Sequence, residues 1–129
     1  MDVQEDMTVV DGICVYRPRG HVSLVEGVAM ITRAIEECRA RKIRKFLFDV
    51  TELTGYPVPT LADRFWMVQD WAQAAQGELI VAAVALPEYI DPGKFGVKAA
   101  IDAGLKSDVF TSAADAQAWL QANELDVTG

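Results

Sequence analysis

Basic side chains are scarce in this sequence, which has 12 Lys and Arg against 19 Asp and Glu and a formal net charge of −7. Broad nucleic-acid binding needs a basic face that displaces counterions from phosphates, and this composition does not favour one. The same charge disfavours general attraction to anionic membranes. We therefore expect no nucleic-acid partner.

Long apolar runs are also missing. No stretch approaches the roughly 20 apolar residues that a membrane-spanning helix needs. The first ten residues, MDVQEDMTVV, are acidic and lack the long apolar segment of a signal peptide. We expect no integral membrane association and a cytoplasmic location.

Cysteine and histidine are few: Cys14, Cys38 and His21 are the complete set. No Cys or His pair has the spacing of metal ligands, so we expect neither a metal site nor a cofactor. Cys14 falls in a strand-like run and Cys38 on the apolar side of a predicted helix. Both are expected to be reduced core thiols, and His21 to have a structural role in a turn.

Apolar residues make up 51% of the chain, and its 129 residues match a single domain spanning 1–129. Asp11-Gly12 is a strong hairpin turn signal between two strand-like runs, MTVV and ICVYRP. Three further apolar runs read as strands, and the first two are apolar enough to be central. These runs are KFLFDV (45–50), ELIVAAVAL (78–86) and SDVF (107–110).

Helix signals separate these strands. Ser23 and Glu26 form a capping box, and an apolar stripe with spacings of three and four follows it. That stripe consists of Leu24, Val28, Ile31, Ile35 and Cys38. The other three helices are predicted from Leu61 to about Gln76 after a Thr60–Asp63 pair, from Asp91-Pro92 to Gly104, and from Ser112 through Leu120.

The order of these elements predicts the fold class. A hairpin followed by alternating strands and helices favours an α/β fold with a mostly parallel central sheet of about five strands and about four helices. The first strand is expected to be the antiparallel partner.

Four segments then carry a resemblance to a known family: GHVSLVE, RKFLFDVTELTG, VAAVALPEYIDPGKF and VFTSAADAQAWL. In order and spacing they resemble the STAS domain, the anti-sigma-factor-antagonist fold, in its SpoIIAA-like branch, which is also grouped with CRAL-TRIO-like folds. The resemblance covers roughly residues 8 to 120. It implies a small non-enzymatic domain, often regulatory.

The resemblance also locates a phosphorylation switch, an Asp-Ser-Ser/Thr-Gly motif at the start of the helix after the first central strand. Counting onward from Asp49 places that motif on Pro57-Val58-Pro59-Thr60. Val58 occupies the phosphoacceptor position and has no hydroxyl, so we expect the usual serine switch to be absent. Thr51, Thr54 and Thr60 are the nearby residues that could be modified instead.

Asp49 carries the alternative hypothesis. It ends an apolar strand, where α/β proteins gather their chemistry, so a small phosphotransferase or hydrolase could use it as a nucleophile. Such enzymes also need an acidic pair for Mg²⁺ at neighbouring strand ends. The strand ends here supply Pro87-Glu88 and Thr111-Ser112. We expect Asp49 instead to accept hydrogen bonds within its own loop, and no catalytic residue is assigned.

Aromatic residues gather around the two middle helices and give the stronger functional signal. By the helix period Trp66 lies about 100° from Phe65, and Met67 and Trp71 form a further pair four residues apart. This helix is therefore apolar more than halfway round, with a core side and a second side. That second side predicts a ligand or partner surface formed by Tyr56, Phe65, Trp66, Trp71, Tyr89 and Phe95.

Three interpretations of the aromatic residues remain open: ordinary core packing, a homodimer through the second helix, and an apolar or lipid-like small ligand. The sequence therefore predicts a non-enzymatic binding domain with a regulatory protein partner or an apolar ligand.

Overall fold

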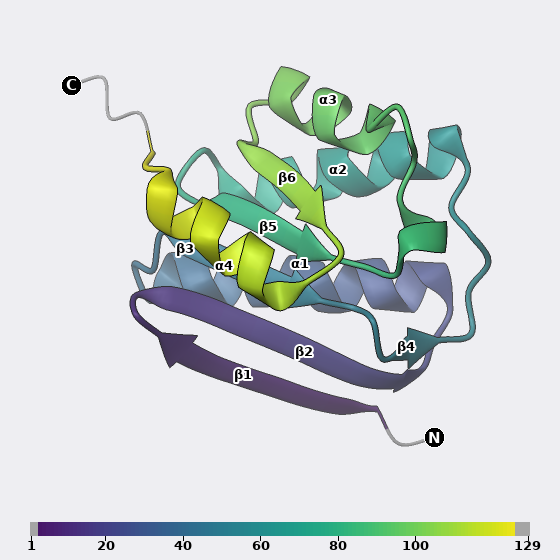
Figure 1. Ribbon diagram of the computed structural model, residues 1–129, viewed down its shortest axis with the longest axis horizontal. Coiled ribbons are helices and arrows are strands. Elements are labelled where there is room, and N and C mark those ends of the chain that lie inside the picture. The colour runs from purple at the N-terminus through teal and green to yellow at the C-terminus, as the bar shows by residue number, and fades with distance from the viewer. Residues whose placement is uncertain (1–2, 126–129) are drawn as a thin grey trace.

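A six-stranded sheet forms the middle layer of the protein, which a computed structural model describes over residues 3–125 (Figure 1). The strands are β1 (Gln4–Val10), β2 (Ile13–His21), β3 (Lys45–Asp49), β4 (Leu53–Thr54), β5 (Ile80–Val84) and β6 (Ser107–Phe110). The helices are α1 (Leu24–Ala40), α2 (Leu61–Ala75), α3 (Phe95–Asp102), α4 (Ala113–Ala122) and a single 3₁₀ turn, η1 (Pro87–Tyr89).

The strand order confirms the predicted topology. The sheet runs β1-β2-β3-β5-β6, with β1 antiparallel to β2 and the other neighbours parallel. The two-residue β4 was predicted as part of a loop. It forms because Leu53 and Thr54 pair in parallel with Gly20 and His21 at the end of β2.

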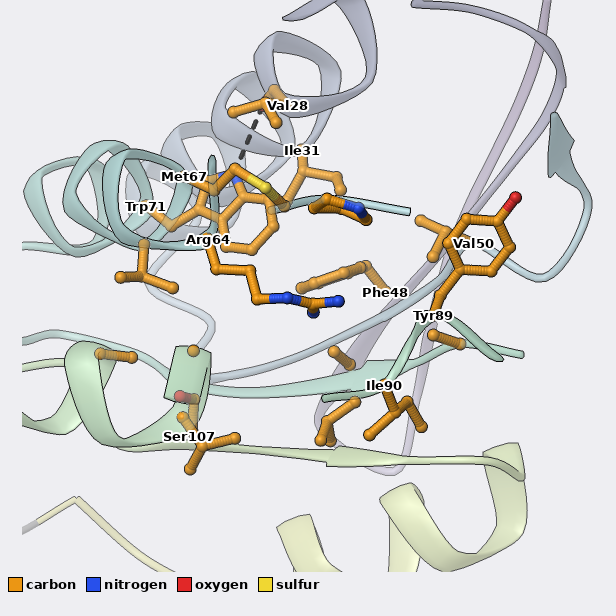
Figure 2. Close-up of a pocket in the computed structure, with 18 of the residues that line it drawn as sticks. Val28, Ile31, Phe48, Val50, Arg64, Met67, Trp71, Tyr89, Ile90 and Ser107 are labelled. Atoms are coloured by element: carbon orange, nitrogen blue, oxygen red, sulfur yellow. Dashed lines mark hydrogen bonds between the residues drawn. The ribbon is translucent and has the colours of Figure 1, made fainter. Parts of the chain in front are cut away.

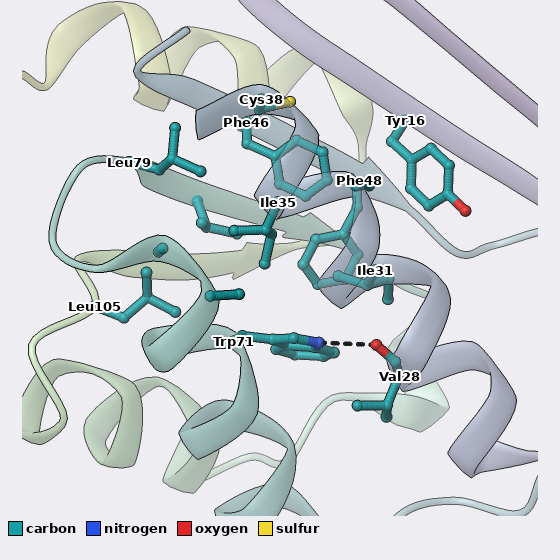
Figure 3. Packing of buried hydrophobic residues seen from close by; sticks show 14 of the residues in the cluster. Tyr16, Val28, Ile31, Ile35, Cys38, Phe46, Phe48, Trp71, Leu79 and Leu105 are labelled. Carbon is teal, nitrogen blue, oxygen red and sulfur yellow. Dashed lines mark hydrogen bonds between the residues drawn. The ribbon is translucent and has the colours of Figure 1, made fainter. Parts of the chain in front are cut away.

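The alternating direction of side chains along the strands divides the core into two parts, one on each face of the sheet. In β3, Phe46 and Phe48 face α1, α2 and α3, whereas Leu47 faces α4 on the other side of the sheet. Because successive side chains of a strand point to opposite faces, a continuous apolar run is what a strand covered on both faces requires. Figure 3 shows the larger core, in which Phe46 and Phe48 pack beneath the helices.

Reciprocal caps fix the starts of α1 and α2 where the sequence predicts them. Ser23 Oγ accepts from the backbone N–H of Glu26 at 3.1 Å, and the Glu26 carboxylate accepts from the N–H of Ser23 at 2.9 Å. Thr60 and Asp63 repeat the arrangement at α2, with both distances 3.0 Å. Each box satisfies donors that a helix start leaves without partners. Over the described residues, no helix combines the length and apolar character needed to cross a membrane.

The predicted start of the third helix at Asp91-Pro92 is wrong. The α3 helix begins at Phe95 after Lys94, whose φ of 53° is left-handed. Pro92 lies in the preceding turn. Asp91 still caps the helix, since its Oδ2 accepts from the N–H of Phe95 at 2.9 Å. This hydrogen bond joins Asp91 to the fourth residue after it, whereas a standard N-cap side chain accepts from the second or third.

Candidate functional site

An apolar pocket lies on the face of β3, β5 and β6 that α1, α2 and α3 cover (Figure 2). Its volume is about 160 Å³. The sheet forms the floor with residues that alternate along their strands and so share one face: Phe48, Val50, Val81, Ala83, Ala85, Ser107 and Val109. The three helices form the walls. Val50 and Ala85 extend the pocket to the carboxyl ends of β3 and β5, and in parallel α/β sheets ligands bind at that end.

Small side chains create the space. Ala83 and Ala85 of the floor carry only a methyl group where their neighbours on β3 carry Phe48 and Val50. Gly27 of α1 and Gly96 of α3 line the walls without any side chain. Dense packing is the rule in protein interiors, so a run of small residues facing one volume leaves room for another molecule.

Two tyrosines close one end of the pocket. Tyr56, from the loop before α2, and Tyr89 of η1 have ring centroids 5.4 Å apart, and the Tyr89 hydroxyl donates to the Tyr56 carbonyl at 3.4 Å. Burial, and then the nearby Tyr89, raises the pKa of Tyr56. The structure thus brings together two of the aromatic residues that the sequence singled out.

Trp71 also lines the pocket, but it is not on an exposed surface. Its side chain is only 8% exposed, its indole nitrogen donates to the Val28 carbonyl at 3.3 Å, and its ring lies 5.2 Å from that of Phe48 (Figure 3). Together with Met67 it forms the predicted second apolar side of α2. That side is directed at α1 and the pocket because α1 packs against α2.

The other predicted aromatic residues lie outside the pocket. Trp66 is half-buried against the core, and its indole nitrogen is 3.3 Å from Asp63 Oδ1, to which it donates. Phe65 and Phe95 are 52% and 36% exposed. The six aromatic residues therefore do not form the expected single surface: three of them line the pocket and three do not.

Charged groups at the pocket are few, and most have partners. Lys94 Nζ and Asp108 Oδ1 are 2.9 Å apart, and Asp91 accepts from the Phe95 backbone. Arg64 of α2 lines the pocket as well; no carboxylate of residues 3–125 lies within salt-bridge distance of it, although the Thr60 backbone N–H and, to a lesser extent, the charge of Arg64 lower the pKa of Asp63.

Asp49 has the role in its loop that the sequence predicts. Its Oδ1 accepts from the backbone N–H of Thr51 at 3.0 Å and from the Thr51 hydroxyl at 2.7 Å. Arg17 Nε lies 4.0 Å from the other oxygen. Asp49 does not line the pocket. Over the described residues, no group of three His, Cys, Asp or Glu side chains is placed to hold a metal ion.

The remaining threonines and Val58 lie along the entry to α2. Thr54 Oγ1 donates to the Gly20 carbonyl at 3.3 Å and lies 3.4 Å from His21 Nδ1. His21 is the last residue of β2, not a turn residue as expected, and it pairs with Thr54 of β4. Thr60 caps α2. Val58 is 50% exposed and occupies the position where the resemblance predicts a phosphoacceptor.

Both cysteines are buried and free, as predicted. A hydrogen bond with the Cys14 thiol and burial raise the pKa of Cys38, which keeps that thiol protonated. Neither residue lines the pocket.

Sequence reasoning missed Arg64 and the small residues of the pocket. Arg64, Val68 and Trp71 lie four and three positions apart on one face of α2, so the sequence places a cation on an apolar stripe. A charged residue on an apolar stripe of a helix could have indicated a binding site at Arg64. Ala83 and Ala85, two positions apart in the run VAAVA, could have indicated the pocket, because small side chains on one face of a central strand leave space there.

Taken together, the strand order, the helices on both faces and the N-terminal hairpin define the STAS, SpoIIAA-like fold. Two solved structures share it. An anti-sigma factor antagonist from Mycobacterium paratuberculosis is 13% identical, with a TM-score of 0.60 over 93% of this chain and 95% of that one. An uncharacterised protein with a SpoIIAA-like fold from Shewanella loihica PV-4 is 18% identical, with a TM-score of 0.54 over 92% and 93%. No family model and no curated protein matches the chain.

Proposed function

We propose that this protein is a non-enzymatic binding domain that takes an apolar small molecule into the pocket between the sheet and α1, α2 and α3. The observation that carries the proposal is a preformed 160 Å³ cavity lined mainly by apolar side chains. Ligand sites are typically concave, apolar and supplied with only a few polar groups.

Size supports the proposal. An apolar cavity of about 150 Å³ is large enough to hold benzene in an engineered lysozyme, whereas one water needs only about 10–15 Å³. The pocket is also partly open to solvent, so a longer ligand could extend out of it. Each buried methylene contributes about 0.8 kcal/mol, so six to eight carbons supply enough free energy for measurable binding.

The test is a titration with 1-octanol, followed through the intrinsic tryptophan fluorescence, to which Trp71 of the pocket lining contributes. We expect a saturable change in the wild-type protein. Ala83→Leu fills the floor and should abolish it, whereas Ala114→Leu adds the same volume on the exposed surface of α4 and should not. A wild-type protein that gives no saturable change, or an Ala83→Leu variant that binds normally, contradicts the proposal.

A second candidate function is regulatory protein binding. It is favoured by the α2 entry surface, which we define as Val58, Leu61 and Phe65 and whose side chains are 50%, 53% and 52% exposed. The fold shared with an anti-sigma factor antagonist supports a regulatory protein partner. A second copy of this chain is the partner that can be tested directly.

Light scattering after size exclusion tests self-association. If the α2 entry surface forms a homodimer, the wild-type protein has the mass of two chains at high concentration, and Phe65→Glu has the mass of one. Thr8→Glu, which places the same charge on exposed β1, is the control. A monomer at all concentrations contradicts the homodimer and leaves the pocket as the site.

A further inference from the structure

Arg64 sets the apolar pocket apart from an ordinary packing defect. Its side chain extends from α2 toward the middle of the pocket, between α2 and the sheet (Figure 2). Within residues 3–125 its guanidinium forms no ion pair, whereas Lys94, the other cation of the pocket, is 2.9 Å from Asp108.

From this juxtaposition we propose that the ligand of the pocket is an anionic amphiphile: a monocarboxylic acid whose carboxylate pairs with Arg64 and whose hydrocarbon body lies against Phe48, Val81 and Trp71. This inference rests on the proposed function and specifies its ligand class.

Charge complementarity argues for an anion. Arg64 is half-buried, so its guanidinium is partly desolvated, which is costly for a cation without an ion pair, and the described chain places no carboxylate within salt-bridge distance of it. A ligand carboxylate would supply the missing partner. Its hydrogen bonds to the guanidinium would also be stronger inside the pocket than in bulk water.

Geometry and charge balance favour a carboxylate over a phosphate. The planar guanidinium matches a carboxylate with two parallel N–H···O bonds. A phosphate monoester carries about −1.5 to −2 charges at neutral pH and would need a second free cation. Lys94 is already paired with Asp108, and Asp91 adds a further negative charge to the lining, so Arg64 is the one cation left for the ligand and a dianion is disfavoured.

The experiment compares octanoate with 1-octanol, which has the same chain length and no charge, by isothermal titration calorimetry. We expect the wild-type protein to bind octanoate about tenfold more tightly than octanol, the size of one charge-assisted interaction. Octyl phosphate should bind no more tightly than octanoate.

Variants at Arg64 assign the preference to this residue. Arg64→Gln should reduce octanoate affinity to that of octanol and leave octanol binding unchanged, which also shows that the variant is folded. Arg64→Lys should keep part of the preference because it keeps the charge. Lys98→Gln removes an exposed cation that does not line the pocket, and should have no effect.

The outcomes separate the two proposals. Equal affinities for octanoate and octanol in the wild-type protein, or a preference that survives in Arg64→Gln, overturn the role of Arg64 while the apolar pocket stands as a binding site. Tighter binding of octyl phosphate overturns the choice of a carboxylate. If neither octanoate nor octanol binds, the proposed function itself is wrong.

Discussion

At the scale of single residues, the loop between β4 and α2 depends on Gly55. Its φ is +100°, and a Cβ built there would lie 2.7 Å from the Val22 carbonyl oxygen and 2.9 Å from two atoms of the His21 ring. The first of these neighbours is backbone and cannot swing aside. No residue other than glycine fits without moving the end of β2.

Replacing this glycine is therefore a sharp test of the loop. Gly55→Ala should lower the free energy of unfolding by about 3 kcal/mol, because backbone strain and a steric clash add. Gly12→Ala is the matched control: its φ is +78°, but nothing lies within 4 Å of the added Cβ. It should cost only about 1 kcal/mol. Chemical denaturation measures both, and equal losses would contradict the clash.

Individual side chains also show the reach of sequence reasoning. The loop role of Asp49 could be predicted, because an Asp side chain at a turn readily accepts from the backbone N–H two residues further on, here that of Thr51. The burial of Trp71 could not, because periodicity gives the angle between two sides of α2 but not which neighbouring helix covers each side. Contact with Val28 of α1 decides that.

At the scale of elements, capping determines where helices begin. The two reciprocal boxes at α1 and α2 were readable from the sequence because each needs only four consecutive residues. The start of α3 was not, because a left-handed Lys94 separates Asp91 from the helix it caps. The short β4 was also hidden, since its two residues are held by pairing with distant β2.

The cap of α2 makes a measurable contribution. Thr60→Ala removes the hydroxyl that accepts from the Asp63 N–H and should destabilise the protein by about 1 kcal/mol. Thr60→Ser keeps the oxygen and should lose far less. Thermal unfolding monitored by circular dichroism distinguishes them, and a Thr60→Ala variant as stable as wild type would show that the cap contributes nothing.

The same box predicts a pH dependence. The backbone N–H of Thr60, followed by the Trp66 indole, lowers the pKa of Asp63 below its ordinary value of 3.8. Because folding lowers the pKa of Asp63, the ionised carboxylate stabilises the folded state fully at pH values above the pKa of the unfolded state. This stabilisation is lost as the pH falls through the lower pKa of the folded state. Melting temperatures should therefore drop below pH 3.8.

Asp63→Asn removes the titrating group and should make this decline in melting temperature shallower. Glu26 contributes in the same direction, since hydrogen bonds from Ser23 lower its pKa from 4.5, so part of the decline should remain in Asp63→Asn. An unchanged slope in that variant would show that Asp63 is not linked to folding.

At the scale of the whole molecule, the fold and the pocket have different origins in the sequence. Hairpin signals, apolar runs and caps determine the order of elements, and these were predictable because each is local. The pocket is formed by distant segments, including Gly27, Ala83 and Gly96, whose only common property is small size. Its existence depends on volumes that remain unfilled after packing, which no local pattern reports.

The central claim is that this pocket is the ligand-binding site of the protein. The most direct test is a titration with octanoate observed by two-dimensional amide NMR of the labelled 129-residue chain. The account predicts saturable shifts concentrated in β3, β5 and β6 and in α1, α2 and α3 around Gly27, Arg64 and Gly96. Residues of α4, across the sheet, should be unaffected. Shifts confined to the α2 entry surface, or no saturable shifts, would contradict it.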